Sequence, residues 1–283
     1  MELIRQLDLS TVIRTALAED IGQGDITTAA TVAPGQAGRA RITVKESSEV
    51  VFCGGFMFEQ VFTMAGSEPT MLSLACEGVR LRHGMVAAEI EGRLAGLLIG
   101  ERVALNFVQL MSGIATATRR YADAIAGRRA RIIDTRKTHP GLRVLEKYAV
   151  RCGGGANHRF SLDSGVLIKE NHIAAAGGVS AALERARALA PHTLRIQIEC
   201  ETLPQVKQAL AAGATSILLD NMTVDELREA RRITGEAVVL EASGGVTLDS
   251  VRSIAETGVD LISVGALTHS VKAVDLSMRI ELV

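Results

Sequence analysis

The chain has 283 residues with 31 Lys and Arg against 32 Asp and Glu, so its formal net charge is −1. A general nucleic-acid or anionic-membrane binder usually carries a clear basic excess, so this balance argues against both classes. Apolar residues make up 47% of the chain and charged residues 22%, which is a globular composition and excludes disorder as the main state. The length predicts one large domain or two unequal ones.

Cysteine usage and the N-terminal segment bear on the compartment. The four cysteines, at positions 53, 76, 152 and 200, form no C-x-x-C pair. We therefore expect reduced, mostly buried thiols rather than a zinc knuckle or a disulfide framework. The first 30 residues lack the apolar region of a signal peptide, and no apolar run approaches the roughly 18 residues of a membrane span. A soluble cytoplasmic protein without a membrane partner is predicted.

The first third of the chain mixes helices and strands without a regular repeat. Its predicted elements are a helix over 10–20, strands over 39–45 and 50–52, and a helix over 55–65. The first helix has a hydroxyl N-cap and ends at Gly22, and the first strand alternates at period two. Residues 99–126 are helical in character, with an interruption predicted at Ser112-Gly113, where we place a domain junction.

After residue 130, short β-branched runs alternate with amphipathic stretches, which predicts a parallel sheet. The runs are 132–133, 166–168, 194–198, 216–219, 237–240 and 261–264, and helical stretches cover 179–190, 203–212, 223–233 and 248–257. Pattern alone does not separate a barrel from an open sheet, although the regular spacing of the strand ends favours a barrel. Because the stretch is shorter than the ~250 residues of an eight-stranded barrel, we predict an incomplete or small one.

The strongest chemical signal is the segment from Asp134 to His172. It holds seven Arg and Lys against four Asp and Glu, so it carries +3 in a chain whose net charge is −1. Arginine binds carboxylate and phosphate in bidentate geometry, so this positive segment predicts a multiply anionic small ligand. A solvated charged face is the alternative. Pro140-Gly141 and the glycines at 153–155 favour a backbone shaped around a ligand.

Acidic residues and glycines follow later predicted strands. Glu199 and Asp220 each end an apolar run, and carboxylates at such positions can hold ribose hydroxyls or a metal–phosphate complex. Structural ion pairing with Lys169 or Arg136 is the alternative for both. Ser243-Gly244-Gly245 and Gly265 also follow strands, where backbone N–H groups suit a phosphate. A glycine turn needed only for chain reversal fits that pattern equally well.

Other patterns carry no predicted function. Neither H-E-x-x-H, a Walker loop nor G-x-G-x-x-G occurs. His83, His192 and His269 are isolated in the sequence, and we expect them to be structural or solvated.

Six longer segments are specific enough to indicate a family. They are EDIGQGDITT at 19–28, ERVALNFVQLMSGIAT at 101–116, the block from DTRKT to IKENH at 134–172, ILLDNM at 217–222, EASGGVTLD at 241–249 and SVGALTHS at 263–270. On these residues the sequence resembles, essentially end to end, the quinolinate phosphoribosyltransferases, also called nicotinate-nucleotide pyrophosphorylases (carboxylating). One departure is Ser161, where the family more often has glycine.

The resemblance implies a fold and a reaction. The fold class is α/β, with an N-terminal α/β sandwich domain over 1–111, an incomplete α/β barrel of fewer than eight strands over 112–269, and a tail at 270–283 packed on the first domain. The reaction converts quinolinate and phosphoribosyl pyrophosphate (PRPP) to nicotinate mononucleotide, carbon dioxide and pyrophosphate, with Mg²⁺, in de novo NAD biosynthesis. The resemblance also implies a homodimer whose active site uses both subunits.

The resemblance further implies a role for each matching residue. Around the quinolinate carboxylates it implies Arg136, His158, Arg159 and Lys169, with Arg102 entering from the partner subunit. Lys137 would face the pyrophosphate and the reacting centre. Glu199 and Asp220 would hold the ribose hydroxyls and Mg²⁺, the metal either directly or through PRPP. Lys137, Lys169, Glu199 and Asp220 form the predicted catalytic set. The 5′-phosphate would lie on Ser243, Gly244 and Gly265, and Thr135 and Gly245 complete the substrate-binding set.

Two other functions remain open at this stage. One is a molybdenum-transport-associated paralogue of the same fold without this activity, and the sequence from Asn157-His158-Arg159 to Lys169 argues for the enzyme instead. The other is an RNA- or protein-binding module that reuses the barrel. The near-zero net charge and the 3% aromatic content disfavour base stacking and therefore an RNA partner.

Overall fold

The computed structural model describes residues 8–283, which divide into two compact units. The first unit contains the chain up to Arg119, residues 139–154 and the C-terminal residues 270–283. The second contains residues 120–138 and 155–269. The chain therefore enters the second unit twice and crosses between the units four times in all. The boundaries predicted from the sequence, at 111/112 and 269/270, stay predictions.

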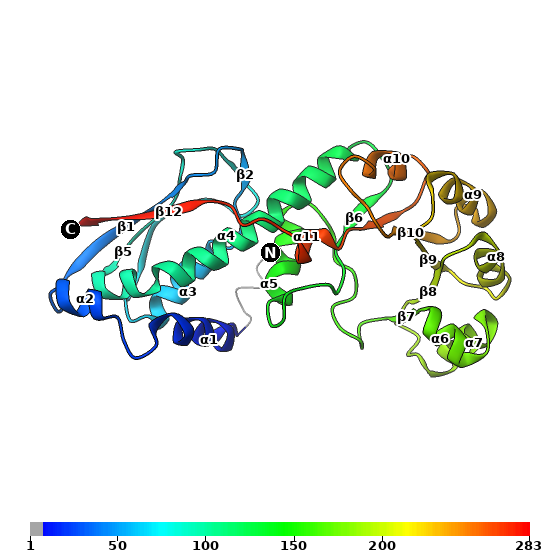
Figure 1. The fold of residues 1–283 in the computed structure, drawn as a ribbon, viewed down its shortest axis with the longest axis horizontal. Coiled ribbons are helices and arrows are strands. Elements are labelled where there is room, and N and C mark those ends of the chain that lie inside the picture. Colours follow the sequence, from blue (N-terminus) through cyan, green and yellow to red (C-terminus); the bar gives the residue numbers. More distant parts are fainter. Residues whose placement is uncertain (1–7) are drawn as a thin grey trace. The chain divides into compact units, whose positions relative to one another are not determined.

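A four-stranded antiparallel sheet forms the centre of the first unit (Figure 1). Its strand order is β12-β1-β5-β3, with β1 (Ala37–Val44), β3 (Thr70–Leu74), β5 (Val86–Arg93) and β12 (Leu276–Leu282); β2 (Val50–Val51) pairs with β4 (Arg80–Leu81) in a separate ribbon. Alternate residues Ala40, Ile42 and Val44 of β1 are fully buried, as the period-two pattern predicts. The pairing of β12 with β1 brings the C-terminal segment into this sheet.

Five helices of the described chain belong wholly or mainly to the first unit. They are α1 (Ser10–Ile21), α2 (Ile26–Thr31), α3 (Phe56–Met64), α4 (Leu94–Ala124) and α5 (Arg143–Cys152). Helices α3 and α4 pass across the sheet (Figure 1), and Gly100 of α4 lets the helix pack closely against Phe62 of α3. The large side chains Phe52, Phe58 and Phe62 are fully buried in this core.

Helix α4 is continuous through Ser112-Gly113, so the predicted interruption is wrong. Both small residues are needed for close contacts rather than for a break. Ser112 Oγ accepts from Cys53 N at 3.0 Å, and a Cβ atom at Gly113 would overlap the carbonyl oxygen of Lys272. The local composition predicted a break in the helix, but Ser112 and Gly113 are small because of the segments that pack against α4.

The expectation that no segment approaches a membrane span also needs correction. By length and composition α4 could cross a membrane. However, 56% of its most apolar 18-residue window is buried inside the structure, and core helices of folded proteins pass the same test. This single helix is therefore weak evidence for a membrane.

The second unit is built on a six-stranded parallel sheet with the order β6-β11-β10-β9-β8-β7. The strands are β6 (Arg131–Ile133), β7 (Val166–Ile168), β8 (Ile196–Cys200), β9 (Ser216–Asp220), β10 (Val239–Ser243) and β11 (Leu261–Ser263). All six coincide with predicted runs to within a few residues. The sheet is open, with β6 and β7 at its edges, so the predicted fold class of α/β with fewer than eight strands is confirmed.

Helices follow the strands of the second unit and cover them. They are α6 (Glu170–Ala176), α7 (Val179–Leu189), α8 (Leu203–Ala211), α9 (Val224–Thr234), α10 (Val251–Ala255) and α11 (Ala266–His269). Helices α7, α8 and α9 lie along one side of the strands (Figure 1). The start of α8 shows how local sequence directs the fold, because Thr202 and Gln205 form a reciprocal capping box.

We predict that Gly113→Ala destabilises the protein although alanine favours helix formation over glycine. The added methyl group would meet the Lys272 carbonyl oxygen, so the substitution should lower the free energy of unfolding by about 1–3 kcal/mol. Asn106→Ala, at an exposed position of the same helix, is the matched control and should change stability by less than about 0.5 kcal/mol. Thermal unfolding followed by circular dichroism measures both, and a more stable Gly113→Ala variant would contradict the packing argument.

Candidate active site

A cavity of about 580 Å³ opens at the carboxyl ends of the parallel strands of the second unit. Twelve of the thirteen predicted site residues line it: Thr135, Arg136, Lys137, His158, Arg159, Lys169, Glu199, Asp220, Ser243, Gly244, Gly245 and Gly265. They follow or end all six strands. Because parallel strands finish at the same edge of a sheet, residues far apart in sequence meet there. The structure brings the set together, and the individual roles stay predictions.

Asp134 holds the two loops that carry the cationic residues. It follows β6, is fully buried, and accepts from Asn157 Nδ2 at 2.5 Å and from His158 N at 2.9 Å. The loop after β6 is fixed further by Thr268 Oγ1, which donates to the carbonyl oxygen of Lys137 at 2.7 Å. The backbones that present the cationic groups are thus positioned before any ligand arrives.

Two arginines line the cavity, and their charges interact. Burial first, and then the neighbouring charge of Arg136, lower the pKa of Arg159. Arg159 Nη1 also donates to the carbonyl oxygen of Gly165 at 3.0 Å, which fixes the side chain. Holding two like charges in a partly buried place costs free energy, and a bound anion would offset that cost. This part of the cavity suits a carboxylate or a phosphate.

Lys169 and Glu199 form an ion pair across neighbouring strands β7 and β8, with Nζ and Oε2 2.7 Å apart. Glu199 is 6% exposed. Burial raises the pKa of Glu199, the Lys169 ammonium opposes that shift, and the negative charge of Asp220 adds to it. The predicted structural ion pair therefore exists, and it lies inside the cavity.

Glu199 and Asp220 also have the chemistry of a magnesium site. They come from the paired strands β8 and β9, and the effect of Asp220 on the Glu199 pKa places the two charges within electrostatic reach of each other. Carboxylate oxygens are ligands that Mg²⁺ prefers, and a cation there would relieve the repulsion. The residues present therefore fit Mg²⁺.

A glycine turn closes the cavity after β10. Gly244 has φ of +93°, and a Cβ atom there would overlap the side-chain amide of Asn221. Gly245 has φ of +57°. Asn221 has a left-handed φ of +56° and donates its N–H to the Ser243 carbonyl oxygen at 2.9 Å, which ties the turn to the end of β9. Only glycine fits at Gly244, and the exposed backbone suits an anionic group.

Glu241 was not predicted as a site residue, yet it lines the cavity with only 1% exposure. Its Oε2 accepts from Gln197 Nε2 at 2.8 Å and lies 3.6 Å from His158 Nε2. His158 Nδ1 accepts from Arg159 N at 2.7 Å, so the proton of the neutral ring is on Nε2, toward Glu241. The signal was available, because Glu241 precedes Ser243 by two residues and alternate residues of a strand share a face.

His269 also lines the cavity, although it was not predicted as a site residue; its prediction as a structural or solvated histidine stays a prediction. A Cβ atom at Gly265 would be 3.1 Å from the His269 ring and 3.3 Å from the Lys137 side chain. The glycine thus gives both groups room. His83 agrees with the structural prediction, since its Nδ1 lies 3.1 Å from the carbonyl oxygen of Lys45.

Arg102 is the one predicted site residue that does not line the cavity. It is exposed on α4 within the first unit. Its role across a subunit interface stays a prediction. Ser161, the departure from the family pattern, has no left-handed φ and hydrogen-bonds to Ser164 and Asp163, so its turn does not require glycine.

The cationic segment at 134–172 divides between the two units. Arg136, Lys137, Arg159 and Lys169 line the cavity. The other three cations, Arg143, Lys147 and Arg151, lie on α5 in the first unit, where Lys147 is 3% exposed. Only four of the seven cationic side chains of the segment therefore line the cavity.

The cavity combines cationic groups with strand-end carboxylates and a glycine turn on an incomplete parallel barrel. These features define an α/β transferase of phosphorylated sugars. Sequence models of the "Quinolinate phosphoribosyl transferase, N-terminal domain" and "C-terminal domain" match residues 25–112 and 114–279. The chain belongs to the quinolinate phosphoribosyltransferase family, which confirms the resemblance read from the sequence.

Individual relatives are similar to this protein over nearly the whole chain. The "Probable nicotinate-nucleotide pyrophosphorylase [carboxylating]" of Bacillus subtilis (strain 168) is 43% identical over 279 residues, covering 99% of this chain and 96% of that protein. The corresponding Mycobacterium leprae protein is 43% identical over 272 residues, covering 94% and 95%. The crystal structure of NadC from Streptococcus pyogenes superimposes with a TM-score of 0.93 at 38% identity, covering 97% of both chains.

The raised pKa of Glu199 predicts a pH dependence of catalysis. A carboxyl with a raised pKa is protonated first as the pH falls, which weakens its pairing with Lys169 and removes its negative charge from the cavity. We expect kcat/KM to decline on the acid side at a pH above the ordinary glutamate pKa of about 4.3. Glu199→Gln, slower throughout, should lack this inflection.

The comparison between the two pH profiles isolates Glu199, because ionisation of the substrates affects both enzymes equally. Asp220→Asn serves as the control, since it removes a neighbouring charge but leaves Glu199 in place. Its inflection should move to lower pH. An identical acid limb in the wild type and in Glu199→Gln would contradict the assignment.

Proposed function

We propose that this protein transfers the phosphoribosyl group of PRPP to quinolinate with decarboxylation, giving nicotinate mononucleotide, carbon dioxide and pyrophosphate in NAD biosynthesis. The observation that carries the proposal is the division of one cavity into a cationic part, an acidic part and a glycine turn. A dicarboxylate, a ribose with its metal and a phosphate need these three environments in turn. The names of the relatives support the same reaction.

The glycosidic bond forms first. The pyridine nitrogen attacks the anomeric carbon of the ribosyl group as the bond to pyrophosphate breaks, and positive charge develops on the sugar. Glu199 and Asp220 offset this charge, while Lys137 faces the departing pyrophosphate. No protein nucleophile is required. Orientation of two bound substrates and fixed electrostatics supply most of the rate.

Decarboxylation follows from the product of the first step. The ring nitrogen is now quaternary and positive, so the carboxyl group beside it leaves as carbon dioxide and its bonding electrons stay on the ring carbon. The adjacent positive nitrogen stabilises this carbanion, which then takes a proton. Arg136, Arg159 and Lys169 orient the carboxylates, so that the ring carboxyl beside nitrogen is the one released.

Mg²⁺ belongs to the proposal as a cofactor. When bound, it neutralises charge on the pyrophosphate of PRPP. Glu199 and Asp220 would hold it, directly or through the ribose hydroxyls of PRPP. Their carboxylate chemistry and their mutual repulsion support this role.

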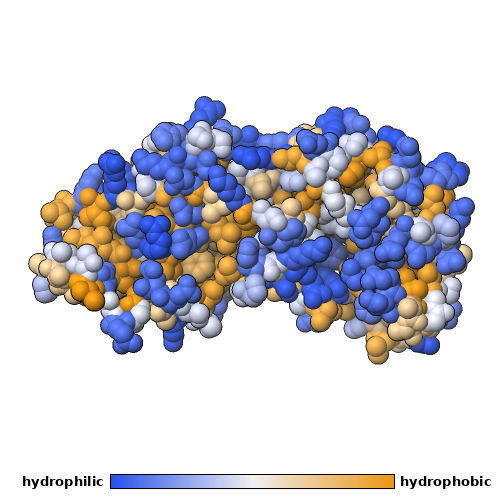
Figure 2. Space-filling view, viewed as in Figure 1, coloured by the Kyte–Doolittle hydropathy of each residue, from blue (hydrophilic) through white to orange (hydrophobic). Residues whose placement is uncertain are grey.

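A homodimer and a cytoplasmic location complete the proposal. The visible face of the first unit carries a gathering of hydrophobic side chains over its helices (Figure 2), and an exposed apolar area of this kind is typical of an interface. In the dimer, Arg102 of each subunit would reach the cavity of its partner and meet a quinolinate carboxylate. The four free cysteines agree with a reducing compartment.

A direct assay tests the function. The protein is incubated with quinolinate, PRPP and Mg²⁺, and nicotinate mononucleotide and released carbon dioxide are measured with and without a chelator. We expect both products in equal amounts and loss of both with the chelator. A folded protein that binds both substrates but forms neither product would be the activity-free paralogue instead.

We predict that Lys137→Ala and Lys169→Ala each lower kcat/KM by about 100- to 1,000-fold, because each removes a cation aimed at developing or transferred negative charge. Lys207→Ala, on the exposed surface of α8, is the matched control and should be unaffected. Steady-state kinetics measures the change, and circular dichroism verifies folding. Near-normal kinetics for either cavity variant would remove that lysine from the mechanism.

The shared site predicts complementation between two inactive variants. Arg102→Ala and Lys169→Ala should each be nearly inactive alone. After the subunits are mixed and re-equilibrated, half of the dimers are mixed and each contains one intact site, so about a quarter of the wild-type activity should return. Lys137→Ala mixed with Lys169→Ala is the control: both residues belong to the cavity of their own subunit, so each cavity of a mixed dimer keeps one defect and no activity should return. Absence of recovery with Arg102→Ala would contradict a contribution across the interface.

A further inference from the structure

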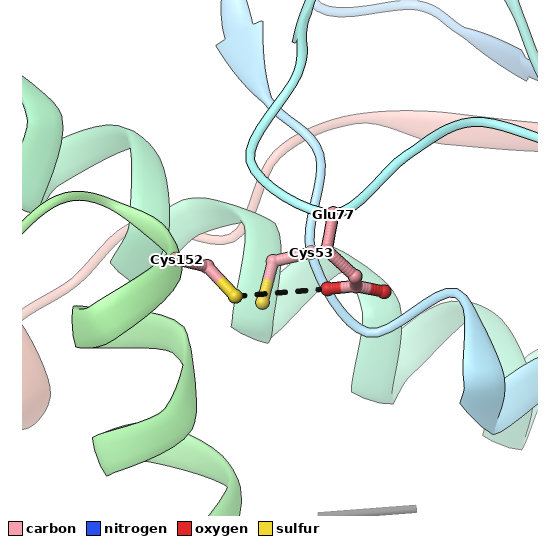
Figure 3. A group of neighbouring side chains, drawn as sticks. All are labelled: Cys53, Glu77 and Cys152. Carbon is pink, nitrogen blue, oxygen red and sulfur yellow. Dashed lines mark hydrogen bonds between the residues drawn. The ribbon is translucent and has the colours of Figure 1, made fainter. Parts of the chain in front are cut away.

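Two thiols and a carboxylate lie together within the first unit (Figure 3). The Sγ atoms of Cys53 and Cys152 and a carboxylate oxygen of Glu77 are all within 4.8 Å of one another. Cys53 follows β2, Glu77 lies in the turn between β3 and β4, and Cys152 ends α5. Every residue that lines the candidate active site belongs to the other unit, so this cluster is not used by the proposed reaction.

The backbone of Cys53 is fixed on both sides. Ser112 Oγ accepts from Cys53 N at 3.0 Å and donates to the Cys53 carbonyl oxygen at 3.1 Å. The next two residues hold the third member of the cluster, because Gly54 N and Gly55 N each donate to the Glu77 carboxylate at 2.8 Å. Cys53 and Glu77 are therefore positioned by the same short loop.

Close backbone packing fixes the other side of the cluster. Gly78, next to Glu77, has φ of +81°, and a Cβ atom there would be 3.2 Å from the carbonyl oxygen of Cys152. A Cβ atom at Gly153 would overlap the carbonyl oxygen of Ala115. The turn that carries Glu77 and the end of α5 thus approach more closely than larger residues would permit, which brings together the backbone segments that carry the three ligand atoms.

All three members of the cluster are groups that can bind a metal ion. Cys152 Sγ donates to Glu77 Oε2 at 3.8 Å, and Cys53 is fully buried beside them. Burial first, and then Cys152 and Glu77, raise the pKa of Cys53, so Cys53 is a thiol when nothing else is bound. Burial and the same neighbours raise the pKa of the Tyr148 hydroxyl as well. A divalent cation would supply the charge that these groups lack.

We propose that Cys53, Glu77 and Cys152 form a zinc site that holds these three segments of the first unit together. Tetrahedral Zn²⁺, with bonds of about 2.3 Å to sulfur and 2.0 Å to oxygen, separates S and O ligands by about 3.5 Å. The 3.8 Å between Cys152 Sγ and Glu77 Oε2 needs only a small adjustment. Water or the Tyr148 hydroxyl completes the coordination.

The exchange that loads the site is balanced in charge. Zn²⁺ replaces one proton on Cys53 and one on Cys152, so two positive charges enter and two leave, while Glu77 stays a carboxylate. Thiolates favour Zn²⁺ and Cu⁺ over hard cations, and the carboxylate oxygen favours Zn²⁺ of the two. The site therefore has different ligands from the all-oxygen environment proposed for Mg²⁺ in the cavity.

Metal binding by the whole, reduced protein tests the proposal. The protein is stripped with a chelator and titrated with Co²⁺ as a spectroscopic probe and then with Zn²⁺ in competition. We expect one Co²⁺ per chain with a thiolate-to-cobalt charge-transfer band, displaced by one Zn²⁺. Because two protons are released, the apparent affinity should rise about 100-fold per pH unit while both cysteines are thiols.

Three variants locate the site. Cys53→Ser and Cys152→Ser should each weaken Zn²⁺ binding by more than about 100-fold, beyond what loss of an outer contact produces. Glu77→Gln keeps an acceptor for Gly54 and Gly55, so it is expected to fold and still bind more weakly. Cys76→Ser is the matched control, since Cys76 is exposed and adjacent to Glu77 but outside the cluster, and it should bind as the wild type does.

The same measurements can overturn the proposal. Failure of the folded, reduced wild type to bind Co²⁺ or Zn²⁺ at micromolar concentration would exclude a metal site. If the reduced wild type binds no metal and loses two thiols on mild oxidation, Cys53 and Cys152 form a disulfide instead of a metal site. Equal loss of binding in Cys76→Ser would move the metal to the surface. None of these outcomes depends on the transferase assay, so failure of the zinc site and failure of the proposed reaction are distinguishable.

Discussion

Parallel pairing of six strands is the constraint on which the site depends. Each strand of the second unit ends at the same edge, so single residues from six separate segments meet around one cavity. The ion pair between Lys169 and Glu199, with Nζ and Oε2 2.7 Å apart, joins the ends of two neighbouring strands. It forms because parallel pairing places those two strand ends side by side. A loss of register in any one strand would turn its site residue to the other face of the sheet.

Like charges held near one another explain why the cavity is suited to a reaction rather than to stability alone. Burial and then Arg136 lower the pKa of Arg159; burial raises the pKa of Glu199, the paired Lys169 opposes that shift, and Asp220 adds to it. Packing in the rest of the protein offsets the free-energy cost of placing these charges here. Ligands of opposite charge reduce that cost when they bind. The buried Asp134, which joins the loop after β6 to the loop at Asn157-His158 by hydrogen bonds, supplies part of that support.

In the first unit, small residues on a long helix allow other segments to pack closely against it. Composition alone predicted that the same residues break the helix. Ser112 and Gly113 were taken to mark a break in α4, but the helix continues, and each residue makes a contact that a larger one would prevent. The same helix brackets Cys53 and so fixes one ligand of the proposed zinc site. Cysteines distant in sequence, without a C-x-x-C pair, become neighbours through this packing.

The sequence by itself determined the α/β class and all six parallel strands, because strand periodicity is a local property. The family and the twelve cavity residues came from the resemblance of its longer segments to a known family. The sequence did not reveal Glu241 or His269, the division of the cationic segment between the two units, or the meeting of Cys53 with Cys152. Each of these depends on which distant segments pack together. Only the tertiary structure decides that, since contact between distant residues depends on the packing of the whole chain.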